Sequence, residues 1–425
     1  MNTQQRQRIA VIGSGISGLA SAHFLARRHL VTLFEANDYL GGHTHTVDVE
    51  VDGLRFAVDT GFLVYNERTY PNLIALFREL DIPSHPTEMS FSVSLDHGRQ
   101  EWAGSNLDTV FAQRGNLLSA GFWGMLGDIL RFNREAERNL ARAAQSPLTL
   151  GELLDAGGYG RRFRDHYLLP MAAAIWSSPC RDILAFPAET FLRFCLNHGL
   201  LQIRNRPPWR TVPGGARQYV DKIAAGLDDI RLGAPVLRVS RVDGQARVLT
   251  QASEETFDAV VFATHAPQTL RLLVDADERE RAVLHAVRYQ PNEAVLHCDD
   301  TLLPRRRRAW AAWNFIGDSH DDGQAVGVSY LLNRLQPLPL DTPVIVTLNP
   351  PRQPAADKVL GRFAYQHPLL DDNAIAAQRA LRGIQGRRAC WFAGAWTGYG
   401  FHEDGLKSGL RVAADFGLAP DWARI

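Results

Sequence analysis

A chain of 425 residues exceeds what one simple hydrophobic core normally holds, so we expect two domains. Its 46 basic residues balance 46 acidic ones, and this net charge of zero argues against a nucleic-acid partner. The four cysteines (180, 195, 298 and 390) are scattered without a C-x-x-C pair, which argues against a disulfide framework or a zinc site and favours reduced thiols.

The first predicted elements are a strand, a glycine-rich turn and a helix. Residues 9–12 are apolar, and the turn Gly13-Ser14-Gly15-Ile16-Ser17-Gly18 leads into a helical stretch over 19–28. In a G-x-G-x-x-G turn, Gly13 permits the tight turn, Gly15 lets a pyrophosphate approach the backbone, and Gly18 lets the helix pack closely on the strand. The helix N-terminus then presents free N–H groups and a positive dipole end to the phosphates.

A second apolar strand, over 30–34, ends on Glu35. The distance from Gly18 to this acid is close to the roughly 20 residues at which a carboxylate binds a ribose 2′-OH. Ala36 follows, and the pair Gly41-Gly42 comes soon after. An NAD site does not need this second pair, although an ordinary turn after a strand would also explain it.

The middle of the chain predicts a separate layer. Segment 86–204 has helical periodicity, and its unusually apolar stretch 117–132 predicts either a buried helix or the lining of a lipid tunnel or its mouth. Segment 291–384 contains the alternating runs 294–298, 327–332 and 344–348, which predict a platform of strands.

Five further motifs occur in order along the chain. The first two are Val58-Asp59-Thr60-Gly61 and the turn Val212-Pro213-Gly214-Gly215, which precedes a helix over 219–227. The next two are the strands 232–239 and 259–267. The fifth is a C-terminal strand followed by the segment from Gly394-Ala395-Trp396 to Gly409. Together with the glycine-rich turn over 13–18 and the pair Gly41-Gly42, they resemble the FAD-dependent amine-oxidase and phytoene-desaturase-like superfamily. More narrowly, residues 41–46, 60–67, 164–171 and 398–405 resemble a bacterial subgroup of NAD/FAD-binding proteins associated with fatty-acyl modification.

The resemblance implies an α/β fold with a Rossmann-like, GR2-type FAD-binding domain and a second, discontinuous α+β substrate domain. The FAD-binding domain would comprise 1–85, 205–290 and 385–425, and the substrate domain 86–204 and 291–384. FAD would bind non-covalently. The cofactor-binding residues would be Gly13, Ser14, Gly15, Ser17, Gly18, Glu35, Ala36, Gly41, Gly42, His43, Thr44, Thr60, Gly61, Val236, Thr264, Gly394, Ala395, Asp404, Gly405 and Leu406.

Two positions depart from the family pattern. His43 stands where the superfamily usually has Arg, so any charge there depends on pH. Ala395 replaces the acid that usually binds the ribityl chain, so ribityl contacts must come from elsewhere. His43 and His45 do not indicate a metal site, because no further ligand is spaced to complete one.

The candidate catalytic residues are Trp396, Tyr399 and His402, all in the predicted flavin loop. His402 is the candidate general base or proton relay, since a free imidazole titrates near neutral pH; the alternative is that it orients the loop through Glu403 or Asp404. The leading function is hydride transfer from a lipid-like, fatty-acyl substrate to flavin N5. The alternatives are an amine oxidase with Trp396 and Tyr399 as half of an aromatic cage, a non-redox flavin isomerase or mutase, and a structural partner of a methyltransferase.

Location is the last expectation. The chain shows no signal peptide and no run of 18 apolar residues, which predicts a cytoplasmic protein. The run Arg305-Arg306-Arg307-Arg308 near Trp310 and Trp313 is either a solvated turn or a contact with the anionic inner face of a membrane. The expected partners are therefore a small-molecule or lipid substrate, a transiently contacted anionic membrane and, from the resemblance, a methyltransferase.

Overall fold

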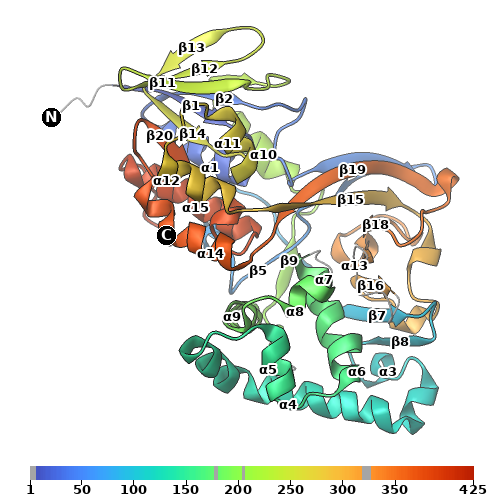
Figure 1. Ribbon diagram of the computed structural model, residues 1–425. Coiled ribbons are helices and arrows are strands. Elements are labelled where there is room, and N and C mark those ends of the chain that lie inside the picture. Colours follow the sequence, from blue (N-terminus) through green and yellow to red (C-terminus); the bar gives the residue numbers. More distant parts are fainter. Residues whose placement is uncertain (1–5, 177–179, 203–205, 318–326) are drawn as a thin grey trace.

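A five-stranded parallel sheet carries the glycine-rich turn. The computed structural model, which describes residues 6–176, 180–202, 206–317 and 327–425, orders its strands β10-β2-β1-β14-β20 (Figure 1). All four neighbouring pairs are parallel. The predicted α/β fold class is therefore confirmed. The strands are β1 (Arg8–Ile12), β2 (Leu30–Phe34), β10 (Asp229–Arg231), β14 (Ala259–Phe262) and β20 (Cys390–Phe392).

Helices cover both faces of this sheet, which explains why its strands are apolar throughout rather than alternating. On β1, Ile9 and Val11 pack in one core cluster, and Ala10 and Ile12 pack in the other. The first cluster includes side chains of α1 (Ile16–Leu25), α2 (Pro71–Glu79), α10 (Arg217–Ala224) and α15 (His402–Asp415). The second includes side chains of α11 (Ala266–Leu272), α12 (Glu278–His285) and α14 (Asp372–Ala380).

A seven-stranded sheet of order β19-β15-β18-β17-β16-β7-β8 forms the second layer. Only β16 and β7 pair in parallel; the other pairs are antiparallel. Figure 1 shows the long strands β15 and β19 running from the parallel sheet toward this layer. The strands are β7 (Phe91–Leu95), β8 (Gln100–Ala103), β15 (Tyr289–His297), β16 (Trp313–Gly317), β17 (Gly327–Leu331), β18 (Ile345–Leu348) and β19 (Val359–Pro368).

Three small antiparallel units complete the strands. They are the hairpin β3 (Thr46–Val51) and β4 (Leu54–Asp59); the sheet β5 (Tyr65–Asn66), β9 (Trp209–Thr211) and β6 (His85–Thr87); and the meander β11 (Arg238–Val242), β12 (Gln245–Leu249) and β13 (Glu254–Phe257). The strands of the parallel sheet come from three separate stretches of the chain, and those of the seven-stranded sheet come from two. The exact domain boundaries stay a prediction.

Helices pack against the seven-stranded layer. They are α3 (Leu107–Val110), α4 (Ala120–Gln145), α5 (Leu150–Ala156), α6 (Arg161–Phe163), α7 (Leu169–Trp176), α8 (Cys180–Leu184), α9 (Ala188–Asn197) and α13 (Leu332–Leu335). Within the described ranges, we find no helix that is both long enough and apolar enough to cross a bilayer. Cys195, Cys298 and Cys390 are free thiols, and Cys180 lies outside the residues whose side chains are described.

The prediction of a buried helix over 117–132 was wrong in two respects. The helix α4 begins only at Ala120, after the Ser119 side chain accepts a hydrogen bond from the Phe122 N–H. Phe122 and Phe132 are buried, whereas Trp123 and Leu130 are about half exposed. The helix is therefore amphipathic, with part of its apolar surface left in solvent.

Candidate functional site: a glycine-lined cleft and an apolar cavity

The turn between β1 and α1 is built from three glycines with different roles. Gly13 has φ +99°, and a Cβ there would lie 2.9 Å from the Ala263 carbonyl oxygen. A Cβ on Gly18 would lie 1.9 Å from the Gly13 oxygen, so helix and strand approach closely only because this residue is glycine. At Gly15, by contrast, a Cβ would meet nothing within 4 Å. Gly15 therefore faces an open cleft, where a ligand can reach the backbone.

The second glycine pair folds back over this turn. The Gly41 N–H donates to the Ser14 oxygen at 3.1 Å, and a Cβ on Gly42 would lie 3.2 Å from the Gly15 Cα. Both glycines have positive φ, +112° and +59°. The two loops therefore meet at the N-terminus of α1, where the backbone N–H groups of the first turn have no carbonyl acceptor within the helix. This is an anion-binding arrangement.

Glu35 lies buried beneath the turn. One carboxylate oxygen accepts hydrogen bonds from the Ser14 N–H at 2.9 Å and the Ser14 Oγ at 2.6 Å, and the other accepts the Asn37 N–H at 2.9 Å. An ionised carboxylate has about four acceptor positions. One position thus stays open for a ribose hydroxyl, while the others hold the loop in place.

The N-terminus of α15 is set against α1 by glycines one helical turn apart. A Cβ on Gly405 would lie 2.7 Å from the Ile16 Cγ2, and one on Gly409 would lie 2.6 Å from the Ser17 oxygen. Asp404 accepts the Phe401 N–H at 3.0 Å and so caps α15; burial raises its pKa to about 6. The first turns of α1 and α15 therefore lie side by side.

His402 is buried and held by two neighbours. Its ring stacks on Phe62, with the ring centroids 3.8 Å apart, and its Nε2 lies 2.9 Å from the Tyr219 hydroxyl, which in turn contacts the Thr44 hydroxyl. Burial lowers the pKa of His402 to about 3, so the imidazole is neutral at physiological pH. In the described structure no hydrogen bond joins this ring to Glu403 or Asp404, whose carboxylates accept backbone N–H groups instead. Its role as a base stays a prediction, and a neutral, weakly basic ring is poorly matched to that role.

Glu403, Trp396 and Tyr399 each contact neighbouring segments of the chain. Glu403 accepts hydrogen bonds from the Asn72 and Leu73 N–H groups, both at 3.0 Å, at the start of α2, and burial raises its pKa to about 7. Trp396 is 1% exposed, and its ring would clash with a Cβ on Gly394. Tyr399 is partly buried, with its ring centroid 5.8 Å from that of Phe194.

Some of the remaining predicted cofactor residues line the cavity, and others do not. The Thr60 hydroxyl contacts the Tyr365 hydroxyl at 2.7 Å, and Gly61 cannot carry a Cβ because it would lie 2.2 Å from the His43 oxygen. The Gly394 N–H donates to the Ser408 Oγ. Gly15, Ser17, Gly41, His43, Thr60, Gly61, Thr264, Gly394, Ala395, Trp396, Tyr399 and His402 line one cavity, whereas Val236 and Leu406 are buried outside its wall and Ala36 is exposed.

Sequence reasoning missed a group of aromatic and imidazole rings opposite His43. The ring of His43 lies 4.8 Å from that of Tyr365 and 5.4 Å from that of His367, and its Nε2 is buried without a hydrogen-bond partner. His265 lies 6.3 Å away. Burial lowers the pKa of His43 well below its usual value and that of His367 to about 4. The signal was present in β19, where Phe363, Tyr365 and His367 alternate and so share one face.

Asp59 was also missed as a structural centre. Its buried carboxylate accepts hydrogen bonds from the Thr46 Oγ1 at 2.5 Å, the Ala216 N–H at 3.0 Å and the Gln336 Nε2 at 2.9 Å. Burial raises the pKa of Asp59 to about 7. The carboxyl group of Asp59 therefore binds both the residue that follows the turn Pro213-Gly214-Gly215 and a segment of the seven-stranded layer, at Gln336.

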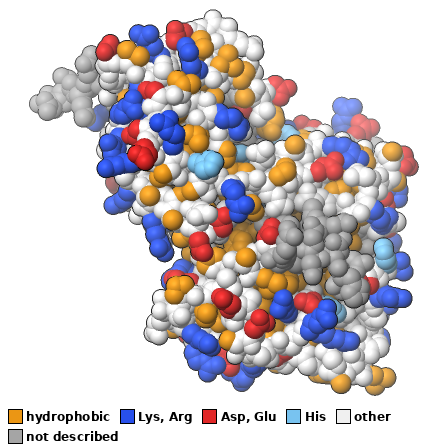
Figure 2. All heavy atoms as spheres, viewed as in Figure 1, with side chains coloured by type: hydrophobic (Ala, Val, Ile, Leu, Met, Phe, Trp, Pro, Cys, Tyr) orange, Lys and Arg blue, Asp and Glu red, His pale blue; other side chains and the backbone are white. Residues whose placement is uncertain are grey.

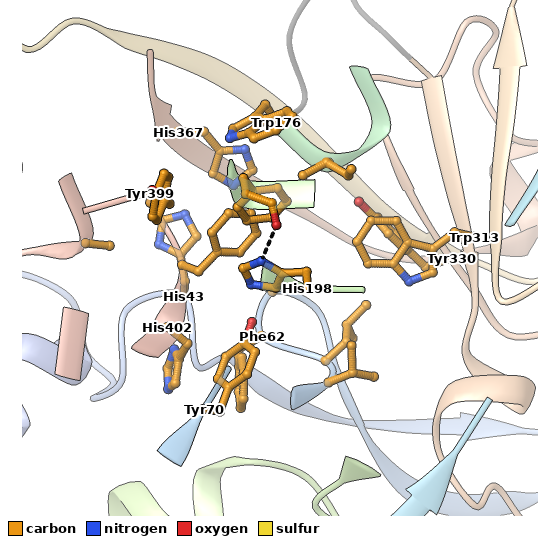
Figure 3. A pocket seen from close by; sticks show the side chains of 18 of the residues that line it. His43, Phe62, Tyr70, Trp176, His198, Trp313, Tyr330, His367, Tyr399 and His402 are labelled. Atoms are coloured by element: carbon orange, nitrogen blue, oxygen red, sulfur yellow. Dashed lines mark hydrogen bonds between the residues drawn. The ribbon is translucent and has the colours of Figure 1, made fainter. Parts of the chain in front are cut away.

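The cavity has a volume of about 590 Å³ and lies between the glycine turn and the seven-stranded sheet. In Figure 3, Trp313 and Tyr330 stand on one side, and His43, Tyr399 and His402 stand on the other. Among the described residues that line it, none is Asp, Glu or Lys, and Arg206 carries the one permanent charge. Among the described residues of this wall, no carboxylate replaces the acid missing at Ala395.

Comparison with known proteins identifies the family. Residues 16–301, the larger part of the chain, match the model for flavin-containing amine oxidoreductases. The chain belongs to this family. Proteins of this family are flavin-containing oxidoreductases, and the predicted cofactor FAD agrees with this.

Solved structures share the fold over nearly the whole chain. A CLA-producing fatty acid isomerase from P. acnes has a TM-score of 0.66 with 16% identity, covering 98% of this chain and 99% of that one. A putrescine oxidase bound to putrescine has a TM-score of 0.70 with 16% identity, covering 97% and 99%. Cyclohexylamine oxidase from Brevibacterium oxydans IH-35A has a TM-score of 0.68 with 16% identity, covering 97% and 100%. Such low identities establish the fold alone.

Curated relatives match over short stretches. Tryptophan 2-monooxygenase from Allorhizobium ampelinum is 39% identical over 71 residues, which is 14% of this chain and 10% of the relative. Carotenoid phi-ring synthase from Streptomyces griseus is 36% identical over 138 residues, 30% of this chain and 25% of the relative. The chain thus spans a quarter or less of the length of these two relatives.

The residues present fit FAD. Gly15 leaves open space where a pyrophosphate approaches, Glu35 keeps an acceptor for ribose, and the first turns of α1 and α15 supply amide donors. The Nε2 of His43 is buried without a hydrogen-bond partner, and the neighbouring rings of Tyr365 and His367 are neutral. No cysteine is among the described residues that line the cavity, and non-covalent attachment of FAD stays a prediction.

Gly15→Val tests the cofactor cleft. Gly15 has φ −61° and ψ 173°, which valine adopts readily, and its Cβ would enter open space, so the protein should fold but lose FAD. We expect the purified variant to be colourless with a normal circular dichroism spectrum. Gly124→Val in α4 is the control, because a Cβ there also meets nothing within 4 Å. Full FAD occupancy in Gly15→Val would contradict the assignment.

Glu35→Ala should weaken FAD binding by about 1.5–3 kcal/mol, the scale of a charge-assisted hydrogen bond, which is roughly a tenfold to hundredfold change in Kd. Fluorescence titration of the apoprotein with FAD measures it. Ser14→Ala removes the hydroxyl that donates to Glu35 at 2.6 Å and accepts the Gly41 N–H at 3.2 Å, and it leaves the Ser14 N–H bond to Glu35 in place. If Ser14→Ala weakens binding as much as Glu35→Ala does, the carboxylate acts through the loop and not through ribose.

His402→Asn separates orientation from proton transfer. Because the pKa of His402 is about 3, wild type and variant should show the same pH profile of substrate-driven flavin reduction between about pH 5 and pH 9, with a rate loss below about tenfold. Phe62→Leu, which removes the stacking partner and keeps the imidazole, should behave similarly. A loss of about 10²-fold or more in His402→Asn alone, with FAD retained, would establish the relay role.

Proposed function

We propose that this FAD-dependent oxidoreductase acts on the acyl chain of a lipid-like substrate. The main support for this proposal is the part of the cavity wall that lies away from the expected position of the flavin. Its large side chains are apolar or aromatic: Met89, Phe91, Trp102, Met171, Ile175, Trp176, Phe194, Trp209, Trp313, Tyr330 and Leu348. A wall of this kind excludes water and orders a hydrocarbon chain through contact area rather than through hydrogen bonds.

The charge distribution supports the same substrate class. The one permanent charge among the described lining residues is Arg206, which is exposed. Pro207 and Pro208 line the cavity beside it and also line a second, shallow depression with Glu67 and Arg68. An acidic head group, a carboxylate or a phosphate, would find a guanidinium there while its chain extends inward.

Bound FAD supplies the acceptor for a hydride at N5, and the chain's residues position the donor carbon. Tyr399 and Phe194, which lie side by side on the wall, are placed to hold an acyl chain against the predicted flavin side. The neutral state of His402 and His367 keeps this end of the cavity uncharged. Among the described residues of the wall, none supplies a fixed negative charge for an ammonium group, which an amine substrate would need unless it entered neutral.

A single-turnover experiment tests the proposal. Purified enzyme is mixed anaerobically with fatty acids and acyl phospholipids of increasing chain length, and bleaching of the flavin band is followed. We expect bleaching with long chains and none with an amine panel. Ile175→Trp, which fills the cavity, should slow long chains most, whereas Leu184→Trp in α8, outside the cavity wall, should not. Bleaching by amines alone would favour an amine oxidase, and double-bond migration without net oxidation would favour an isomerase.

A further inference from the structure

Exposed hydrophobic side chains concentrate at one end of the molecule. Of the thirteen large hydrophobic residues exposed in the described structure, five lie between 107 and 130: Leu107 (77% exposed), Leu117 (47%), Leu118 (93%), Trp123 (52%) and Leu130 (55%). We call these five residues the leucine–tryptophan patch. In Figure 1, α3 and α4 lie at the edge opposite the parallel sheet, and Figure 2 shows hydrophobic side chains gathered at the lower right of that edge.

The patch is held in place from within. The Trp123 Nε1 donates to the Leu117 oxygen at 3.0 Å, and the Trp123 ring lies 5.2 Å from that of Phe111. On α4, Phe122 and Phe132 point into the core, while Trp123 and Leu130 are seven residues apart and so share the outer face. No residue of α4 is among those that line the cavity, so these side chains do not form the lipid tunnel that the sequence suggested.

Arginines border the patch. Arg307 and Arg308 lie on the turn η4 (Arg307–Ala309), which packs on α3, and Arg308 lies 3.7 Å from Asp108, an acid that also binds Arg114. Asp108 is the acid that faces these side chains, and it is shared by two guanidiniums. Arg307 lies over the Trp310 ring at 5.3 Å. The border therefore carries excess positive charge.

The run Arg305–Arg308 does not act as one unit. Glu101, fully buried, accepts the N–H groups of Arg305 and Arg306 and the Arg306 Nη1 at 2.8 Å. Arg306 thus anchors the loop. Arg305, Arg307 and Arg308 remain exposed.

We propose that the leucine–tryptophan patch, with Arg114, Arg307 and Arg308, docks on the surface of an anionic phospholipid bilayer. Leucine side chains enter the acyl region, tryptophan prefers the interface, and guanidiniums bind lipid phosphates. A second copy of this chain fits less well, because a two-fold contact would bring the arginines of one copy against those of the other. The docking surface is independent of the substrate proposed above, since the patch and the cavity wall share no residue.

Vesicle sedimentation tests this surface. The FAD-loaded protein is pelleted with vesicles of phosphatidylglycerol and phosphatidylcholine, and flavin absorbance in the pellet is measured. We expect binding at low salt that weakens as salt rises, and little binding to phosphatidylcholine alone. Leu118→Ser with Trp123→Ser, and separately Arg307→Gln with Arg308→Gln, should each raise the lipid concentration for half-binding about tenfold or more.

Matched controls come from exposed side chains outside the patch. Leu54→Ser with Leu237→Ser removes side chains of similar exposure, 44% and 48%, and Arg55→Gln with Arg238→Gln removes exposed guanidiniums. Both should bind like wild type. The proposal fails if wild type stays in the supernatant at low salt, or if the control pairs lose as much binding. It also fails if light scattering shows a dimer that Leu118→Ser with Trp123→Ser dissolves while lipid has no effect. Each outcome leaves the anaerobic flavin assay unaffected.

Discussion

The buried carboxyl group of Asp59 is the contact on which the two layers depend. It joins Thr46, the backbone of Ala216 and the side chain of Gln336, three segments that are remote in sequence. A buried carboxyl that loses a donor keeps its full desolvation cost, so these segments must arrive together. The end of β4, the start of α10 and the seven-stranded layer are thereby fixed relative to one another, and the cavity between the layers keeps its shape.

The cofactor half of the site was predictable because its determinants are local. Gly13, Gly15 and Gly18 act within one turn, and Glu35 reaches that turn through Ser14 after a single helix and strand. Spacing along the chain therefore carries the geometry. The same holds for Gly405 and Gly409, whose separation of four residues places both on the face of α15 that meets α1.

The cavity wall was not predictable in the same way. His43 meets Tyr365 and His367 only because β19 crosses from one layer to the other, a long-range pairing that no local pattern encodes. The exposure of Trp123 was missed for a related reason: periodicity shows that a helix has an apolar face, but not whether a neighbour covers all of it. Likewise, the run of four arginines does not show that Glu101 binds Arg306, the second of them.

The close contact between α1 and α15 also bears on motion. Because Gly405 and Gly409 let α15 pack directly on Ile16 and Ser17, the first turns of the two helices at the predicted cofactor cleft keep a fixed spacing. Neither can swing away without unpacking the other. The hydrogen bonds of Gln336 to Asp59 and of Tyr365 to Thr60 tie the seven-stranded side to the end of β4. A rearrangement that widens the cavity between the layers has to break these hydrogen bonds, whereas the packing of α1 on α15 can stay intact.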